Sequence, residues 1–176
     1  IFDPVTLFDI VLIKYNSTGD TVWARIYNNP FNNDDIPEGL SVDSLGNAYI
    51  AATMGAGPSR ITTIRYNPSG VLQWAAVYTG PGNLSCGAND LEIDNIGNTY
   101  VTGTVPSLGS ALTIKYNTSG DTVWTRLKSQ SGFSHFGQFI SLDNSNNIYT
   151  AITKVNTSTN LDLFLVVKYN SVGSEQ

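Results

Sequence analysis

The sequence predicts an all-β protein made of repeated four-stranded antiparallel sheets, and three recurring phrases support this prediction. A Lys/Arg-Tyr-Asn triplet occurs at residues 14–16, 65–67, 115–117 and 168–170. Tryptophan occurs at residues 23, 74 and 124, and the phrase Asp-x-x-x-Asn-x-Tyr at residues 43–49, 94–100 and 143–149. The tyrosines of the triplet are 51, 50 and 53 residues apart. So regular a step is the sequence signature of a repeat architecture.

One period contains four predicted strands, at residues 39–43, 48–53, 60–67 and 71–78. They are rich in Val, Ile, Thr, Tyr and Trp, the residue types that favour strands. No window sustains the i, i+3, i+4, i+7 apolar spacing of an amphipathic helix. Applied to the whole chain, the repeat predicts thirteen strands in consecutive groups of two, four, four and three.

Glycine marks the turns between these strands. A type I turn followed by a left-handed residue favours Gly at its last position, and Asn is the next-best residue there. Asn146 takes this position in one turn. The glycines expected to be left-handed are Gly19, Gly46, Gly70, Gly97 and Gly120.

The aspartates that open the second phrase are Asp43, Asp94 and Asp143. We expect each carboxylate to accept backbone N–H bonds across its own turn. Metal binding is the weaker alternative, because the D-x-D-x-D spacing of a calcium loop is absent.

The repeat indicates a β-propeller. A four-stranded sheet cannot cover both of its faces, whereas sheets packed around an axis cover one another. About three and a half such blades fit this chain. We expect the repeated aromatic side chains to fill the layers between blades. The residues assigned structural roles in the repeat are Tyr15, Gly19, Trp23, Asp43, Asn47, Tyr49, Tyr66, Gly70, Trp74, Asp94, Asn98, Tyr100, Tyr116, Gly120, Trp124, Asp143, Asn147 and Tyr149.

The segments "KYNTSGDTVWTR" and "LSVDSLGNAYIAAT" resemble the bacterial repeat named for seven-bladed β-propellers, the SBBP repeat. The resemblance covers nearly the whole chain and recurs at least three times. "LSVDSLGNAYIA" is also similar to the NHL-type propeller repeat. The SBBP resemblance implies an extracytoplasmic bacterial location, secreted or at the cell surface, and it implies no catalytic residues.

The chain is expected to form a single partial propeller domain over residues 1–176. Its blade-like units are placed near 1–38, 39–89, 90–138 and 139–176. The last copy stops at Gln176, one residue before the position at which a Trp is expected. Three and a half blades leave two uncovered ends. We therefore expect either a ring of about seven blades from two copies, or further repeats in a longer polypeptide.

Composition excludes several classes of function. The net charge is −5, and the basic residues are scattered singly, so a nucleic-acid partner is not expected. Cys86 is the one cysteine, which rules out an internal disulfide and a cysteine-ligated zinc site. No apolar run is long enough to span a membrane.

Ligand-binding residues are expected in three long connections between blades, at 28–38, 79–89 and 128–138, because these differ between copies. Asn and Asp oxygens in the first offer a calcium site as a weaker alternative to a solvated loop, and no other cofactor is expected. The lone histidine lacks an identifiable catalytic partner. The candidate loop residues are Asn32, Asn33, Asp34, Asp35, Asn89, Asp90, His135 and Phe136.

The leading functional hypothesis is a non-enzymatic extracellular propeller that acts as a scaffold or protein-interaction module. Its partner is expected to be another copy of the chain, the remaining blades of a longer chain, or a protein or glycan ligand. A carbohydrate-binding propeller is the alternative, and it requires aromatic side chains to converge on the loop-rich face. A fragment of a propeller hydrolase or lyase is less favoured, and it requires paired carboxylates such as Asp34, Asp35 or Asp90 with an acid of another repeat.

Overall fold

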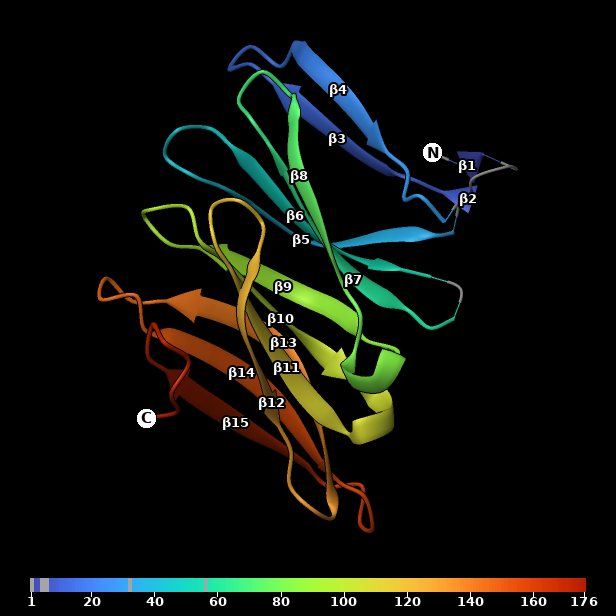
Figure 1. The fold of residues 1–176 in the computed structure, drawn as a ribbon, viewed down its shortest axis with the longest axis vertical. Helices are drawn as coiled ribbons and strands as arrows, with labels where there is room; N and C mark the ends of the chain where they lie inside the picture. Colours follow the sequence, from blue (N-terminus) through green and yellow to red (C-terminus); the bar gives the residue numbers. More distant parts are fainter. Residues whose placement is uncertain (1, 4–6, 32, 56) are drawn as a thin grey trace.

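The protein consists of antiparallel sheets that lie side by side in chain order, from the N-terminal strands to the C-terminal strands (Figure 1). The computed structural model describes residues 2–3, 7–31, 33–55 and 57–176. The four main sheets contain two, four, four and three strands, as the repeat predicts. The all-β fold of a partial propeller is therefore confirmed. No helix in the described part of the chain is long and apolar enough to cross a membrane.

The thirteen predicted strands are β3 to β15, and a short additional ribbon precedes them. The ribbon pairs β1 (Phe2–Asp3) with β2 (Leu7–Phe8). The first sheet holds β3 (Ile10–Tyr15) and β4 (Thr21–Tyr27). The second holds β5 (Asp35–Val42), β6 (Ala48–Met54), β7 (Arg60–Tyr66) and β8 (Leu72–Tyr78). The third holds β9 (Gly87–Ile93), β10 (Thr99–Val105), β11 (Ser110–Tyr116) and β12 (Thr122–Lys128). The fourth holds β13 (Phe133–Leu142), β14 (Ile148–Asn156) and β15 (Asp162–Tyr169).

The first strands of the second, third and fourth sheets begin earlier than the sequence predicts. β5 starts at Asp35 rather than at residue 39, and β9 and β13 start at Gly87 and Phe133. Each of the three strands carries one extra residue, at Glu38, Asn89 and Gln138, where the pairing register shifts. A bulge of this kind breaks the alternation of side chains, so the pattern conceals the start of the strand. The expected long connections are correspondingly shorter.

The core lies in the layers between neighbouring sheets. One layer gathers Tyr49, Ile61, Leu91 and Val101 from the second and third sheets. The middle strands β6, β7, β10 and β11 are buried on both faces, whereas the outer strands β4 and β8 alternate between partly buried and exposed positions. Sheets stacked face to face explain this pattern, because only the middle strands are covered on both sides.

The turn predictions are confirmed in detail. The five predicted glycines have φ values between 74° and 90°, and Asn146 has φ 59°. Each phrase-opening aspartate accepts two backbone N–H bonds through Oδ1, as in Asp43 with Leu45 and Asn47. The local chemistry of these short phrases therefore sets the hairpins.

Candidate functional site

Each tryptophan of the repeat forms a hydrogen bond from its own sheet to the next one. Trp23 Nε1 on β4 donates to the Pro68 carbonyl in the β7–β8 turn, at 3.0 Å. Trp74 and Trp124 donate in the same way to Thr118 and Ser171, at 3.1 and 3.3 Å. In each case the indole therefore donates to the backbone carbonyl at the equivalent position of the next sheet. We call this arrangement the interblade clamp.

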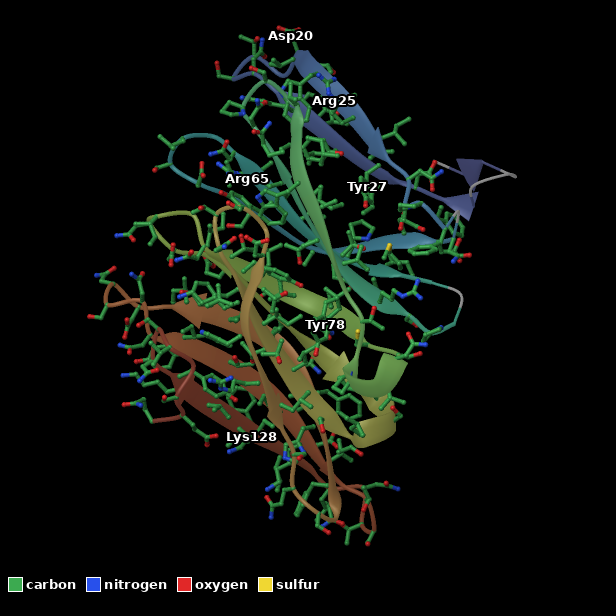
Figure 2. All side chains as sticks on the ribbon, viewed as in Figure 1. Asp20, Arg25, Tyr27, Arg65, Tyr78 and Lys128 are labelled. Atoms are coloured by element: carbon green, nitrogen blue, oxygen red, sulfur yellow. The ribbon has the colours of Figure 1, made fainter. Side chains whose placement is uncertain are left out.

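The basic residue of the Lys/Arg-Tyr-Asn triplet completes the clamp. Arg65 Nη1 donates to the Thr118 carbonyl at 3.2 Å, the acceptor that Trp74 also uses. Lys14 and Lys115 repeat this geometry with Pro68 and Ser171. In two of the three interfaces an arginine adds further bonds, as where Arg25 Nε donates to the Gly70 carbonyl at 2.6 Å (Figure 2). These cations thus bind backbone oxygens of the neighbouring sheet.

The turn glycine leaves room for the tryptophan of the preceding sheet. A Cβ at Gly70 or Gly120 would lie 2.8 Å from Cδ2 of Trp23 or Trp74. Gly19 has the same left-handed backbone, but a Cβ there would meet nothing within 4 Å. Two conditions therefore favour glycine at this position of the clamp. The backbone has a positive φ, and the adjacent indole leaves no space for a side chain.

Tyrosines flank Trp74 and Trp124. The Trp74 ring lies 6.2 Å from Tyr49 of its own sheet and 6.4 Å from Tyr116 of the next. Trp124 repeats this with Tyr100 and Tyr169, at 6.2 and 6.3 Å. Burial raises the pKa of Tyr169 to about 12. The expectation that the aromatic residues pack between blades is confirmed for these residues.

The Asp-x-x-x-Asn-x-Tyr phrase forms a closed hydrogen-bond group within each turn. Beyond its two backbone bonds, Asp43 accepts a bond from Asn47 Nδ2 at 2.7 Å and one from Tyr49 Oη at 3.2 Å through Oδ2. The other two copies are the same. Burial opposes ionisation of Asp43, but these bonds outweigh it and lower the pKa of the carboxyl. A carboxylate with four internal donors has little capacity left for a metal ion.

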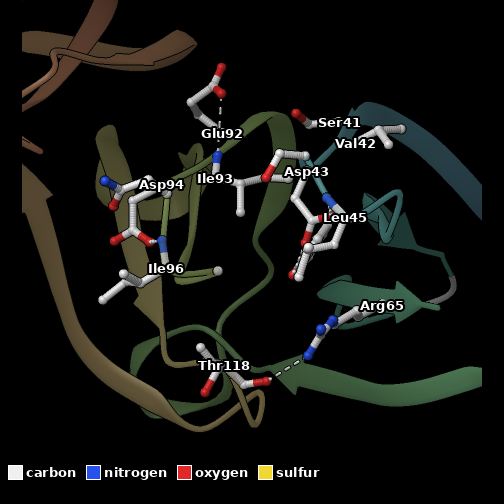
Figure 3. A pocket seen from close by; sticks show the side chains of 14 residues that line it. Ser41, Val42, Asp43, Leu45, Arg65, Glu92, Ile93, Asp94, Ile96 and Thr118 are labelled. Atoms are coloured by element: carbon white, nitrogen blue, oxygen red, sulfur yellow. Dashed lines mark hydrogen bonds between the residues drawn. The ribbon is translucent and has the colours of Figure 1, made fainter. Parts of the chain in front are cut away.

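A cavity of about 380 Å³ lies between the turns of the second and third sheets. Figure 3 shows Asp43 and Asp94 on opposite sides of it, with Arg65 bonded to the Thr118 carbonyl. Both aspartates are held by their turns, and the arginine belongs to the clamp. Asp43, Asp94 and Arg65 therefore have structural roles at this cavity.

The acidic residues of the first expected loop are also engaged. Asp35 lies in β5, not in a loop, and is 2% exposed. It accepts bonds from the backbone N–H and Nδ2 of Asn29, at 2.9 and 2.7 Å. Burial raises the pKa of Asp35, and those bonds oppose the rise. Asp34 accepts from the Phe8 N–H, and the Asn33 carbonyl accepts from Asn29. Asn32 lies outside the described residues.

The remaining candidate residues lie in strands, which corrects their assignment to loops. Asn89 is the bulged residue of β9. Asp90 Oδ2 accepts a hydrogen bond from the Ile140 N–H at 3.0 Å, which links β9 to β13. His135 and Phe136 lie in β13. The histidine is 1% exposed, and its backbone N–H donates to the Gly109 carbonyl. Burial lowers the pKa of its imidazole ring.

The thiol of the single cysteine is buried, and the acidic residues that the structure describes are dispersed over several strands and turns. Cys86 is buried, its sulfur lies 3.6 and 3.8 Å from the carbonyl oxygens of Tyr78 and Ser59, and burial raises the pKa of the thiol. In the described ranges, no group of three or more His, Cys, Asp or Glu side chains is placed to hold a metal ion.

The exposed surface of the fourth sheet is the feature that the sequence analysis missed. Phe139, Ala151 and Val166 are direct partners across β13, β14 and β15, and Phe164 is the partner of Thr153. Partners across a sheet point to one side. On this side, which we call the tail face, Phe164 is 73% and Phe139 66% exposed.

The tail face departs from its counterparts in the inner sheets. By register, Phe139 corresponds to Gly39 and Asp90, and Val166 corresponds to Thr63 and Thr113. Both threonines are buried under the next sheet. Small or polar residues thus occupy the covered positions, and large apolar residues occupy the uncovered ones. Apolar side chains clustered on a surface mark a contact site.

Sheets in series, joined by a recurring clamp, define a protein of β-propeller repeats. Residues 22–53 match the family model of the SBBP beta-propeller repeat. The predicted resemblance is thereby confirmed over the segment from β4 to β6. The same clamp at Trp74 and Trp124 shows that the repeat geometry continues beyond the matched residues. No curated protein matches the chain.

Proposed function

We propose that the chain is a non-enzymatic β-propeller module that acts as a scaffold for protein–protein contact. The observation that carries the proposal is the tail face. Phe139 and Val166 are exposed at positions where the second and third sheets carry small or polar residues, and the exposed ring of Phe164 lies on the same face. A surface of this kind is costly in water and is stabilised when a partner covers it.

The absence of an assembled reactive site among the described residues favours the scaffold over a hydrolase or lyase. Asp34, Asp35 and Asp90 each accept a backbone N–H bond and do not form a paired acid and base in the described structure. A glycan-binding face gains little support, because the Arg60 guanidinium covers the exposed ring of Phe31 at 4.6 Å. An extracellular location, secreted or on a bacterial surface, is part of the proposal and rests on the family resemblance.

The proposal is tested by light scattering on purified protein across a concentration series. We expect the mass of the wild-type protein to rise with concentration, and the rise to shrink in a Phe164→Asp variant. Val123→Asp is the matched control, because Val123 is also an exposed strand residue, 53% accessible, on another sheet. A protein that stays monomeric throughout, or that turns over glycoside, ester or peptide substrates, would contradict the proposal.

A further inference from the structure

The first turns of the second and third sheets carry apolar residues at a position where the fourth sheet has a serine. Leu45 and Ile96 occupy the third position of the Asp-x-x-x-Asn-x-Tyr phrase, and Ser145 occupies it in the fourth sheet. The backbone N–H of each residue donates to Oδ1 of the aspartate that opens its turn. Serine makes the same bond, and polar residues are the usual choice in turns. The turn therefore does not require the apolar side chains.

The two apolar side chains lie on the two sides of the cavity between the second and third sheets (Figure 3). Leu45 is 75% and Ile96 68% exposed. A single exposed aliphatic residue is common, whereas two such residues beside one hollow form an apolar surface for contact. A second hollow of about 230 Å³, at the turns of the third and fourth sheets, adjoins the first, and Glu92 and Asp94 line both. We call the two hollows together the turn groove.

Glu92 is a further residue that the repeat does not require. It pairs across the sheet with Tyr100, and the residues in the same register of the second and fourth sheets are Ser41 and Ser141. Glu92 Oε1 accepts a hydrogen bond from the Ile93 N–H at 3.3 Å, and Oε2 accepts none from the described residues. One carboxylate oxygen is therefore open to a donor from another molecule.

The turn groove is negatively charged. Among the described residues that line it, the carboxylates are those of Asp43, Glu92, Asp94 and Asp143, and the one cation is Arg65. The guanidinium of Arg65 is engaged by the clamp. The three aspartates accept the hydrogen bonds of their own turns. They therefore attract a cation by their charge, whereas Glu92 can bind it directly.

We infer that the turn groove binds an extended segment of a partner protein in which an Arg or Lys is next to an apolar residue. The basic group pairs with Glu92, and the apolar side chain lies between Leu45 and Ile96. The charge of the groove disfavours acidic peptides and nucleic acid, and its apolar sides give no advantage to a small hydrated cation. The groove shares no residue with the tail face, so it adds a second contact surface to the proposed scaffold.

The test begins with a displayed library of random linear peptides, selected against the purified full chain. We expect the enriched peptides to combine a basic residue with a neighbouring apolar one. Fluorescence anisotropy then measures the binding of the most enriched peptide. Glu92→Ser, and the double variant of Leu45→Ser with Ile96→Ser, should each weaken binding by on the order of tenfold. Added salt should also weaken the binding to the wild-type protein.

The variants are chosen so that loss of binding can be separated from loss of the fold. Each serine is the residue that another copy of the repeat carries at that position, so the urea midpoint should not change. Two matched controls remove exposed residues at the opposite ends of the sheets. Asp162→Asn lies at the start of β15, and Leu108→Ser lies in the short 3₁₀ helix Pro106–Leu108 between β10 and β11. Both controls should bind the peptide normally.

Several outcomes would overturn the inference. They are enrichment of acidic peptides, no enrichment, binding that survives the groove variants, and an equal loss of binding in the controls. A change of mass by light scattering in the Leu45→Ser, Ile96→Ser variant, with no peptide enriched, would assign the groove to a second copy of the chain instead. Phe164→Asp leaves the groove intact, so the tail face and the turn groove can fail their tests independently.

Discussion

Replacing Gly120 with alanine should separate the two reasons for a glycine in the clamp. Gly120 has φ 87°, and a Cβ there would lie 2.8 to 3.0 Å from three atoms of the Trp74 ring. Gly97 is the matched control within the same sheet, because its φ is 89° but its nearest atoms would lie at 3.4 and 3.5 Å, an ordinary contact distance.

The expected magnitudes follow from these distances. A left-handed residue that carries a Cβ costs about 1–2 kcal/mol, and both variants incur this loss. Forcing a methyl group against the packed indole adds about 1–3 kcal/mol, and only Gly120→Ala incurs this loss. We therefore expect Gly97→Ala to lower the free energy of unfolding by about 1–2 kcal/mol and Gly120→Ala by about 2–5 kcal/mol.

Urea unfolding followed by tryptophan fluorescence and by circular dichroism measures both variants, and coincident transitions establish two-state behaviour. A double variant with Trp74→Ala removes the obstructing ring. In that background the cost of Gly120→Ala should fall to that of Gly97→Ala. Equal losses for the two single variants, or an unchanged cost without the ring, would refute the account of the clamp.

Three further predictions concern single residues. Trp74→Phe should cost about 1–3 kcal/mol by urea unfolding, because it removes the N–H donated to Thr118 and part of the packed ring, while Arg65 still satisfies that carbonyl. It should cost less than Trp74→Ala, about 3–5 kcal/mol, which removes the whole ring, and equal losses would contradict a packing role for the remaining ring. The pKa of Asp43 is lower in the folded protein than the value of 3.8 expected in the unfolded chain. The ionised carboxylate therefore stabilises the fold at pH values above 3.8, and this stabilisation is lost as the pH falls through the folded-state pKa. The stability difference between the wild type and Asp43→Asn should therefore shrink below about pH 4, and a difference independent of pH would contradict the hydrogen-bond account. Cys86 should not react with a thiol reagent until the protein unfolds, and fast labelling of the native protein would show that the site opens.

The hairpins were predictable because each one is encoded by neighbouring residues. The left-handed positions of Gly46 and Asn146, and the backbone bonds accepted by Asp43, depend on contacts within five residues of sequence. Turn chemistry of this range is visible in a single period. The regular step of the repeat then fixed the order and number of the sheets.

The clamp was not predictable in the same way, because its partners lie on different sheets. Trp23 and Pro68 are 45 residues apart, and the acceptor is a backbone carbonyl that leaves no trace in residue type. The one available signal was the nearly constant separation between each tryptophan and the following turn, which is 44 residues for Trp74 and 47 for Trp124.

The candidate ligand residues were misplaced for a different reason. A single bulged residue in β5 and in β13 shifts the alternation of buried and exposed side chains by one residue. The pattern of the sequence therefore places Asp35 and His135 in a loop. Their burial follows from neighbouring sheets that a single period does not reveal.

The interblade clamp also gives the repeat a direction. Every indole and basic donor lies on the side of the following unit, and every turn carbonyl and glycine hollow lies on the side of the preceding one. Such an interface is heterologous, so a two-fold axis through it would set donors against donors. Duplicating a whole unit within the series, by contrast, repeats the same donors and acceptors of the clamp at the new junction. A unit added after the fourth sheet would instead require small or polar residues at the positions of Phe139 and Val166, because the equivalent positions of the second and third sheets are covered.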